Sequence, residues 1–350
     1  MNIFIDSNIL HEDYFFMNKS TKQILDYTKR GLVNLYMSQI VFMELKRHYE
    51  LELEERNTQI KRINKDAPRL LVAPGYGLID IPVYLAKFDS FYSDMDKRCD
   101  NFYILPFKNE YLPNIVERAV RKTKPFTETK TELKDAIIWL TYSEFVEKKH
   151  LSDCLFLTAN SSDFCDKKDK SVIHKTLQAD TKRFIVINSS FDFIKKYAST
   201  IDSPEYIFEK YVDSLDIDDN FAFDKIQSNF DNIITVKIHE KVDKLSVSDV
   251  VSKKDGWFDG QLVGYDTELM HCDNIEYDVV GERAIISGYL YLSCEVEVLK
   301  YNPDRDPGED SFIYEEERNI FFCLRFNFDM IQDEVCQDFE VIEIEVEDVK

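Results

Sequence analysis

The stretch that decides the fold is Met1-Asn2-Ile3-Phe4-Ile5-Asp6-Ser7-Asn8, at the start of the sequence. Residues 2–5 form a short apolar run, which is typical of a strand buried in a parallel sheet. An Asp follows this run directly. Ligands of open α/β sheets bind at the carboxyl ends of the strands, so Asp6 is a candidate functional residue. Asp residues also cap helices, and on this feature alone the capping interpretation stays open.

Short apolar runs alternate with helical patterns through the first 200 residues. Strands are predicted at residues 2–5, 33–37, 154–158 and 184–187. Helices are predicted at residues 21–29, 39 to about 65, 83–97, 112–121 and 133–148. Strands that alternate with helices indicate βα units and therefore a parallel sheet.

The hydrophobic period becomes two after about residue 220. Ile342, Ile344 and Val346 alternate with glutamates, as expected for a half-solvated antiparallel strand. Similar alternation occurs at residues 233–238, 285–299 and 320–328. The predicted fold is therefore an α/β domain over residues 1–200, followed by a β-rich (α+β) domain over residues 201–350.

Charge divides the chain at the same place. The 350 residues carry a formal net charge of −22. Residues 1–200 hold 31 Lys+Arg and 28 Asp+Glu, whereas residues 201–350 hold 13 and 38, so the balances are +3 and −25. A polyanion is repelled only by the second part. The alternative interpretation is that this acidic surface serves solubility.

Composition excludes several classes of protein. The sequence is 44% hydrophobic and 31% charged, which is ordinary for a globular protein. No apolar run approaches the ~18 residues of a membrane span, and the start does not have the pattern of a signal peptide. The seven cysteines form no CxxC pair, which favours a reducing cytoplasm without zinc knuckles. The Rossmann fingerprint GxGxxG and the P-loop motif GxxxxGK[ST] do not occur. The six histidines show no HxH or HExxH spacing, which disfavours histidine-based catalysis.

Three further acidic residues stand at ordered places. Glu44 lies near the start of the long helix, Asp135 lies in the first turn of an apolar helix, and Asp163 follows a buried strand in the sequence FLTANSSDF. Each has an ordinary interpretation: a surface glutamate, a carboxylate that complements the helix dipole, and an Asx-type turn. Their joint order after a strand that ends in Asp is less ordinary.

This order resembles the PIN-domain nucleases, and within them a long bacterial PIN-like subgroup. The residues that carry the likeness are NIFIDSNIL, SQIVFMELKRHY, KPFTETKTELKDAIIW and FLTANSSDF, and the resemblance covers about residues 1–195. It implies a parallel sheet flanked by helices, with the acidic residues converging at the carboxyl edge. Many PIN domains carry Asp two residues after the strand Thr, where this chain has Asn160.

The resemblance implies metal-dependent endonucleolytic cleavage, most often of single-stranded RNA, and a role such as a toxin or antiphage-defence effector. Carboxylates suit Mg²⁺ or Mn²⁺, and such an ion lowers the pKa of bound water. The motif assigns the catalytic and metal-binding roles to Asp6, Glu44, Asp135 and Asp163. The supporting residues that it assigns are Ser7, Asn8, Thr158 and Asn160.

A basic cluster before the Asp135 helix is predicted to bind nucleic acid. Its members are Arg118, Arg121, Lys122, Lys124 and Lys134, with Lys130 between them. The partners expected are nucleic acid (RNA before DNA), a protein partner or inhibitor at the acidic C-terminal part, and further copies of the chain, but no membrane.

Two other functions stay open. One is a non-catalytic PIN-fold protein that binds nucleic acid or acts as a scaffold. This alternative stays open because Asn160 stands where many PIN domains have an Asp. The other is a phosphatase on a doubly wound sheet, for which a DxD motif is expected where the chain has Asp6-Ser7-Asn8.

Overall fold

The computed structural model describes all residues except 71–74, 128–131, 167–168, 171, 252–259, 303, 307 and 309. The chain divides into two compact units, unit 1 (Met1–Asp202) and unit 2 (Ser203–Lys350). Among the described residues, no helix is both long enough and apolar enough to cross a membrane.

Unit 1 is built on a five-stranded parallel sheet in the order β3-β2-β1-β4-β5. The first strand of the chain lies in the middle, and Ile5 at its end is level with Met37 on one side and Leu157 on the other. Every residue of β1 and β4 is buried. The strands are β1 (Asn2–Ile5), β2 (Asn34–Ser38), β3 (Phe102–Leu105), β4 (Cys154–Leu157) and β5 (Phe184–Ile187). The predicted parallel sheet is confirmed, and β3 is an edge strand that the sequence pattern did not reveal.

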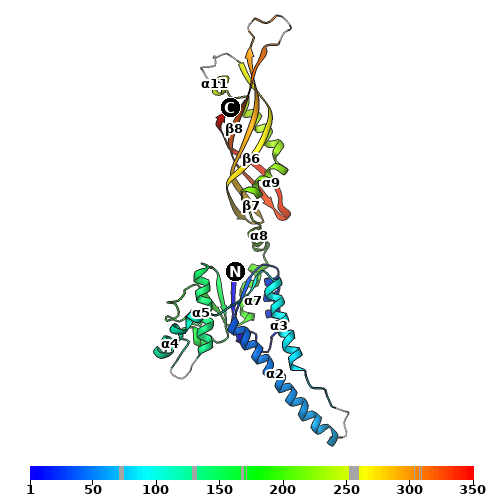
Figure 1. Cartoon of the computed structure of the whole chain (residues 1–350), viewed down its shortest axis with the longest axis vertical. Helices are drawn as coiled ribbons and strands as arrows, with labels where there is room; N and C mark the ends of the chain where they lie inside the picture. The colour runs from blue at the N-terminus through cyan, green and yellow to red at the C-terminus, as the bar shows by residue number, and fades with distance from the viewer. Residues whose placement is uncertain are drawn as a thin grey trace. The chain divides into compact units, whose positions relative to one another are not determined.

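The helices of unit 1 flank this sheet and confirm the predicted α/β layers. Ser38 caps α2 by accepting a hydrogen bond from the Val41 amide, and α2 ends shortly before Pro68. Helices α2 and α3 pack together and run away from the sheet (Figure 1). The helices are α1 (Lys19–Lys29), α2 (Gln39–Asp66), α3 (Ile81–Arg98), α4 (Leu112–Arg121), α5 (Leu133–Lys148), α6 (Ser161–Phe164) and α7 (Ser190–Ile201), with short 3-10 turns at Ser7–Ile9, Ala67–Leu70 and Asn109–Tyr111.

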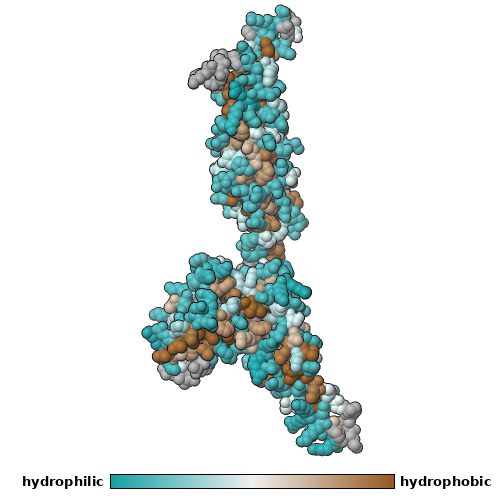
Figure 2. All heavy atoms as spheres, viewed as in Figure 1, coloured by the Kyte–Doolittle hydropathy of each residue, from teal (hydrophilic) through white to brown (hydrophobic). Residues whose placement is uncertain are grey.

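Unit 2 is a four-stranded antiparallel sheet in the order β6-β7-β8-β9, with helices packed on one face. Phe208, Ile226 and Ile234 from the helices share a core with Leu290 and Phe326 from the sheet. Hydrophilic atoms cover most of the face of this unit that is visible in Figure 2. The elements are α8 (Pro204–Asp213), α9 (Asp219–Asn229), α10 (Asp231–Val242), α11 (Val247–Val250), β6 (Gly260–Val280), β7 (Arg283–Tyr301), β8 (Phe312–Ile331), the turn Gln332–Glu334 and β9 (Val335–Val349).

The strand predicted at residues 233–238 is wrong, because this segment lies inside α10. Its buried residues are Ile234, Ile238 and Val242, which repeat every four positions and so form one face of a helix. Ile233 and Val236 are about half exposed. The apparent alternation arose because Val236, on the exposed side of the helix, was read together with the buried Ile234 and Ile238 as one face of a strand.

Strand β6 escaped prediction for a related reason. Its pairing with β7 shifts register at three places along its length, at residues 264–266, 269–271 and 273–276. Each bulge adds a residue and reverses which side chains point inward, so a simple period of two is lost. In β9 a shift of the same kind leaves Ile342 half exposed, while Ile344 packs on the core as expected.

Candidate active site

Polar groups follow three neighbouring strands of unit 1 at the carboxyl edge of the sheet. Asp6 follows β1 and Thr158 follows β4, while Ser38, the last residue of β2, caps α2. All three are buried. Because the strands are parallel and in register, these groups and the helices that begin after them lie at one edge.

Tyr142 fixes α5 against this edge. Its hydroxyl donates a hydrogen bond to the Ile5 carbonyl (2.7 Å) and accepts one from the Ser38 amide (2.8 Å). The side chain is fully buried. Asp135 precedes Tyr142 by two helical turns, about 10 Å at 1.5 Å per residue. These two hydrogen bonds of Tyr142 therefore fix how far the N-terminus of α5 extends over the ends of β1 and β2.

The Asp6 carboxylate is held in one orientation by four donors. Its Oδ1 accepts hydrogen bonds from the Ser7 amide (2.7 Å) and, more weakly, from the Ser7 hydroxyl (3.5 Å). Its Oδ2 accepts from the Asn8 amide (2.7 Å) and the Thr158 hydroxyl (2.7 Å). Asp6 thus caps the turn at Ser7–Ile9 as well as standing at the site, so the two interpretations of this residue are compatible.

Glu44 reaches this site from α2. Its Oε2 accepts a hydrogen bond from the Ser7 hydroxyl (3.0 Å), so Ser7 connects it to Asp6. Its Oε1 forms an ion pair with Lys134 of α5. The hydrogen bond with Glu44 raises the pKa of Lys134 above its usual value, because the pairing stabilises the charged amine.

A group of three carboxylates lies beside this pair. Glu132, Asp135 and Asp163 each offer an oxygen, and these oxygens lie within 4.8 Å of one another, which is close enough to hold one metal ion. Glu132 was not among the residues expected from the sequence. Its signal was available, because Glu and Asp three positions apart at a helix start face the same way.

Burial and crowding of negative charge shift the pKa of two of these acids. Burial raises the pKa of Asp135 to about 8, and the charges of Asp6, Glu132, Asp163 and Glu44 add to the effect. Burial likewise raises the pKa of Asp6 to about 6, although its hydrogen bonds with Thr158 and Ser7 oppose the shift. Asp135 therefore lies within electrostatic reach of all four other acids, and they share one site.

Asn160 holds Asp163 in place. Its side-chain amide donates a hydrogen bond to Asp163 Oδ2, its backbone amide donates to the Thr158 hydroxyl (3.1 Å), and its side-chain oxygen accepts from the Ser162 hydroxyl (3.1 Å). Asp163 is buried, on α6. Where an Asp was expected from many PIN domains, the amide thus orients the neighbouring carboxylate.

The basic residues predicted to bind nucleic acid separate into two groups. Lys134 borders the acids, and Lys124 donates a hydrogen bond to the carbonyl of Ser162, next to Asp163. Arg121 and Lys122 are exposed at the end of α4. Lys130 lies outside the described residues.

Arg118 differs from that expectation, because its side chain is buried in the protein. Its guanidinium forms two hydrogen bonds with Asp180 (2.6 and 2.7 Å), and Asp180 also accepts one from the Trp139 indole (2.7 Å). Only 10% of the Arg118 side chain is exposed. This arginine therefore ties α4 to α5 and is not free to bind phosphate.

Residues 3–164 match the family model described as a PIN domain. Unit 1 is a PIN domain. This match spans all the acids of the site and agrees with the parallel sheet described above. PIN domains are in general nucleases, and the nuclease members use divalent metal ions. No curated protein matches the chain as a relative.

The donor set of this PIN domain fits a divalent metal ion. All of the groups are hard oxygen ligands, which Mg²⁺ and Mn²⁺ prefer. Glu132, Asp135 and Asp163 are within the reach of a single ion, whereas Asp6 and Glu44 lie outside that group of three. The four acids taken from the motif therefore lie at one site, and the structure adds a fifth.

Proposed function

We propose that this chain is a metal-dependent endoribonuclease that hydrolyses phosphodiester bonds in single-stranded RNA. The observation that supports it most is the group formed by Glu132, Asp135 and Asp163 at the carboxyl edge of a PIN-domain sheet, beside Asp6 and Glu44. Mutual repulsion of these carboxylates disfavours their ionised forms, and a bound cation relieves it.

The residues of the site divide the work of hydrolysis. A bound Mg²⁺ or Mn²⁺ supplies a more acidic water and offsets charge on the scissile phosphate. Glu132, Asp135 and Asp163 would hold this ion, and Asp6 and Glu44 would orient the attacking water or hold a second ion. Thr158, Asn8 and Asn160 act as positioning residues that fix the carboxylates. Lys124 and Lys134 border the acids and bind the phosphates on either side.

Metal dependence tests this proposal. Purified chain is incubated with labelled single-stranded RNA or DNA of the same sequence, with Mn²⁺, Mg²⁺ or EDTA. We expect RNA cleavage with either ion, products that carry a 5′-phosphate, and no cleavage in EDTA. Cleavage that persists in EDTA would contradict the metal assignment. Binding of RNA without cleavage under every condition would favour the alternative of a non-catalytic PIN-fold scaffold.

We propose the cytoplasm as the place of action. All seven cysteines are free, although several lie buried in the two cores. Free thiols persist in reducing compartments, where RNA is also present. Acid quenching of intact cells, followed by alkylation of the denatured chain and mass spectrometry, checks this, since buried thiols then react and only disulfide-linked cysteines resist the reagent.

We further propose that the acidic sheet of unit 2 keeps RNA away and takes a basic protein partner. Cross-strand register places one row of polar side chains on the face opposite the helices, such as Asp273, Tyr289, Arg325 and Glu343. Acidic residues dominate this face: Asp266, Glu268, Asp273, Glu276, Glu295, Glu297, Glu317, Glu340, Glu343 and Glu345. Such a potential attracts lysine- and arginine-rich segments and repels phosphates.

Charge reversal on this face is the test. In the full chain, Glu297, Glu343 and Glu345 are replaced together by Lys. We expect the wild type to bind an arginine-rich peptide at low salt and the variant to lose this binding. The variant should gain RNA affinity about tenfold at 50 mM salt, because new phosphate contacts form. Unchanged affinity for both ligands would show that the face binds neither.

A further inference from the structure

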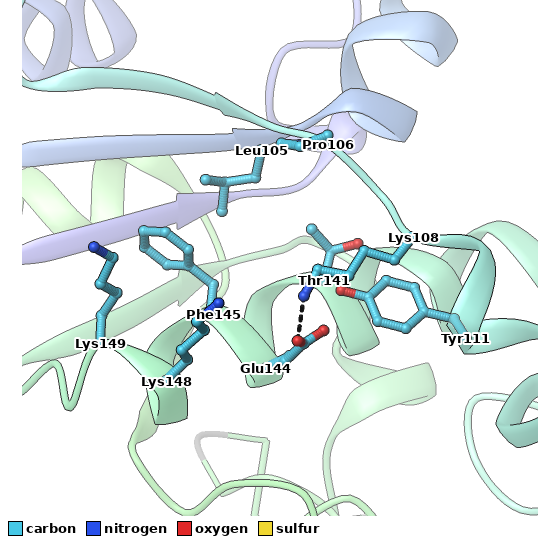
Figure 3. Close-up of a pocket in the computed structure, with 9 residues that line it drawn as sticks. All are labelled: Leu105, Pro106, Lys108, Tyr111, Thr141, Glu144, Phe145, Lys148 and Lys149. Atoms are coloured by element: carbon cyan, nitrogen blue, oxygen red, sulfur yellow. Dashed lines mark hydrogen bonds and ion pairs between the residues drawn. The ribbon is translucent and has the colours of Figure 1, made fainter.

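A cavity of about 270 Å³ lies in the PIN domain between α5 and the segment that follows β3. None of the five acids of the site lines it. Its walls are largely apolar, with the ring of Phe145 from α5, and with Leu105, Pro106 and the ring of Tyr111 from the end of β3 and the segment that follows it (Figure 3). Phe145 is held by contacts with Phe4 and Tyr36 of the sheet. The cavity is slightly smaller than the ~300–1,000 Å³ of typical ligand pockets, which suits one flat ring system.

The charged groups at the cavity are three lysines and one glutamate. Lys108 forms an ion pair with Glu144, drawn as a dashed line in Figure 3, and Lys148 and Lys149 line the same cavity. Hydrogen bonds from Lys108 and Tyr111 lower the pKa of Glu144, so its carboxylate stays ionised and can accept further hydrogen bonds. The pocket thus combines aromatic walls, one anionic acceptor and an excess of positive charge.

These features together fit one unpaired base with its phosphates. Bases of single-stranded RNA stack on aromatic side chains, and their exocyclic amino groups donate to carboxylates. The three lysines that line the cavity would bind the phosphates on either side of this base. An aliphatic anion would satisfy the lysines but would offer no donor to Glu144, so the acceptor favours a base that carries an amino group.

Helix α5 connects this cavity to the acids. Lys134, Thr141, Phe145 and Lys148 follow one another at spacings of seven, four and three, which places them on one face of the helix. Lys134 contacts Glu44 at one end of this row, and the other three line the cavity. The row from Lys134 to Lys148 is about 21 Å long at 1.5 Å per residue, a length that several nucleotides span.

We propose that this cavity binds one amino-bearing base of the RNA strand, several nucleotides from the bond that is cleaved. The proposal rests on the proposed function, because it assigns the base to the substrate of the same PIN domain. It makes Tyr111, Glu144 and Phe145 determinants of specificity that take no part in the chemistry.

Binding to the full chain tests the cavity without any need for cleavage. Affinity for a labelled 12-nucleotide RNA is measured by fluorescence anisotropy in the Asp6→Asn background. Thr141→Met fills the cavity, and we expect it to weaken binding about tenfold to a hundredfold, the size associated with one stacked base. Lys148→Glu should weaken binding more than Lys29→Glu, which makes the same charge change on an exposed residue of α1. Thermal unfolding of each variant confirms that it is folded.

The second measurement concerns the acceptor. Cytidine monophosphate should compete with the labelled RNA better than uridine monophosphate, and Glu144→Gln should abolish the difference. Unchanged RNA affinity in folded Thr141→Met would overturn the proposal, as would equal losses in the two lysine variants or equal competition by both nucleotides. If the binding results are as expected but the wild-type chain cleaves RNA with neither Mn²⁺ nor Mg²⁺, the proposed base site is supported and the nuclease proposal fails.

Discussion

We expect Asp6→Asn to lower the rate of the proposed metal-dependent RNA cleavage by at least about 100-fold, the scale associated with loss of a preorganised electrostatic group from a site of reaction. The substitution keeps the shape of the side chain and removes its charge. Asp6 is buried and held by Ser7, Asn8 and Thr158, so its charge has a fixed position at the site. Single-turnover cleavage at saturating Mn²⁺ measures the loss.

A matched control separates this effect from a general loss of charge. Asp26 is an exposed carboxylate on α1 that pairs only weakly with Arg30 (3.7 Å), and Asp26→Asn should leave the rate unchanged.

The resemblance to PIN-domain nucleases implies a role as a toxin or defence effector. That role predicts that expression of the wild type in a bacterial host slows growth, while expression of Asp6→Asn does not. Full cleavage by Asp6→Asn would remove this residue from the catalytic group.

Asp135→Asn should make the metal-free protein more stable at pH 8, although it removes activity. The pKa of Asp135 is about 8 in the folded chain against an ordinary value of 3.8, so the folded state binds this proton more tightly than the unfolded state. The contribution of Asp135 to stability is then greatest below about pH 4 and is lost as the pH rises towards 8. The pKa of Asp6, about 6, adds a loss between pH 4 and 6. The Asn variant lacks the larger of these losses, which is on the order of several kcal/mol.

Thermal unfolding from pH 4 to pH 8.5, with and without Mn²⁺, measures this effect. In EDTA the variant should unfold several degrees above the wild type at pH 8, and the two should converge towards pH 4. Saturating Mn²⁺ should raise the unfolding temperature of the wild type, more at pH 8 than at pH 5.5 because fewer protons must be displaced. A variant that is less stable than the wild type in EDTA at pH 8 would show that Asp135 is not under electrostatic strain.

Local pattern predicted much of the PIN domain. Burial of β1 and β4 on both faces makes their sequences continuous apolar runs, and the helices of unit 1 repeat every three to four residues, so most of these elements show in their own segments. The edge strand β3 is only partly buried and does not. Periodicity failed where one segment could be read in two ways, as at residues 233–238, or where bulges interrupt β6. Both of these failures of periodicity lie in unit 2, beyond the PIN-domain match, whereas the missed edge strand β3 lies inside it.

The candidate site shows the same limit at the level of single residues. The motif order singled out Asp6, Glu44, Asp135 and Asp163 as candidate site residues, and the structure brings them to one edge of the sheet. The motif order could not show that Glu132 joins Asp135 and Asp163 within the reach of one ion. The motif order also could not show that Arg118, a member of the basic cluster, forms a buried ion pair with Asp180.

By itself, the sequence determined the order of most strands and helices in unit 1, the acids at their ends and the contrast of charge between the two halves, because these follow from residues close together in the chain. Only the tertiary structure decided which acids lie within the reach of one ion, which basic residues remain exposed and where a cavity with aromatic walls lies. Those outcomes depend on contacts such as Tyr142 with Ile5 and Ser38, which join segments more than a hundred residues apart and leave no local pattern.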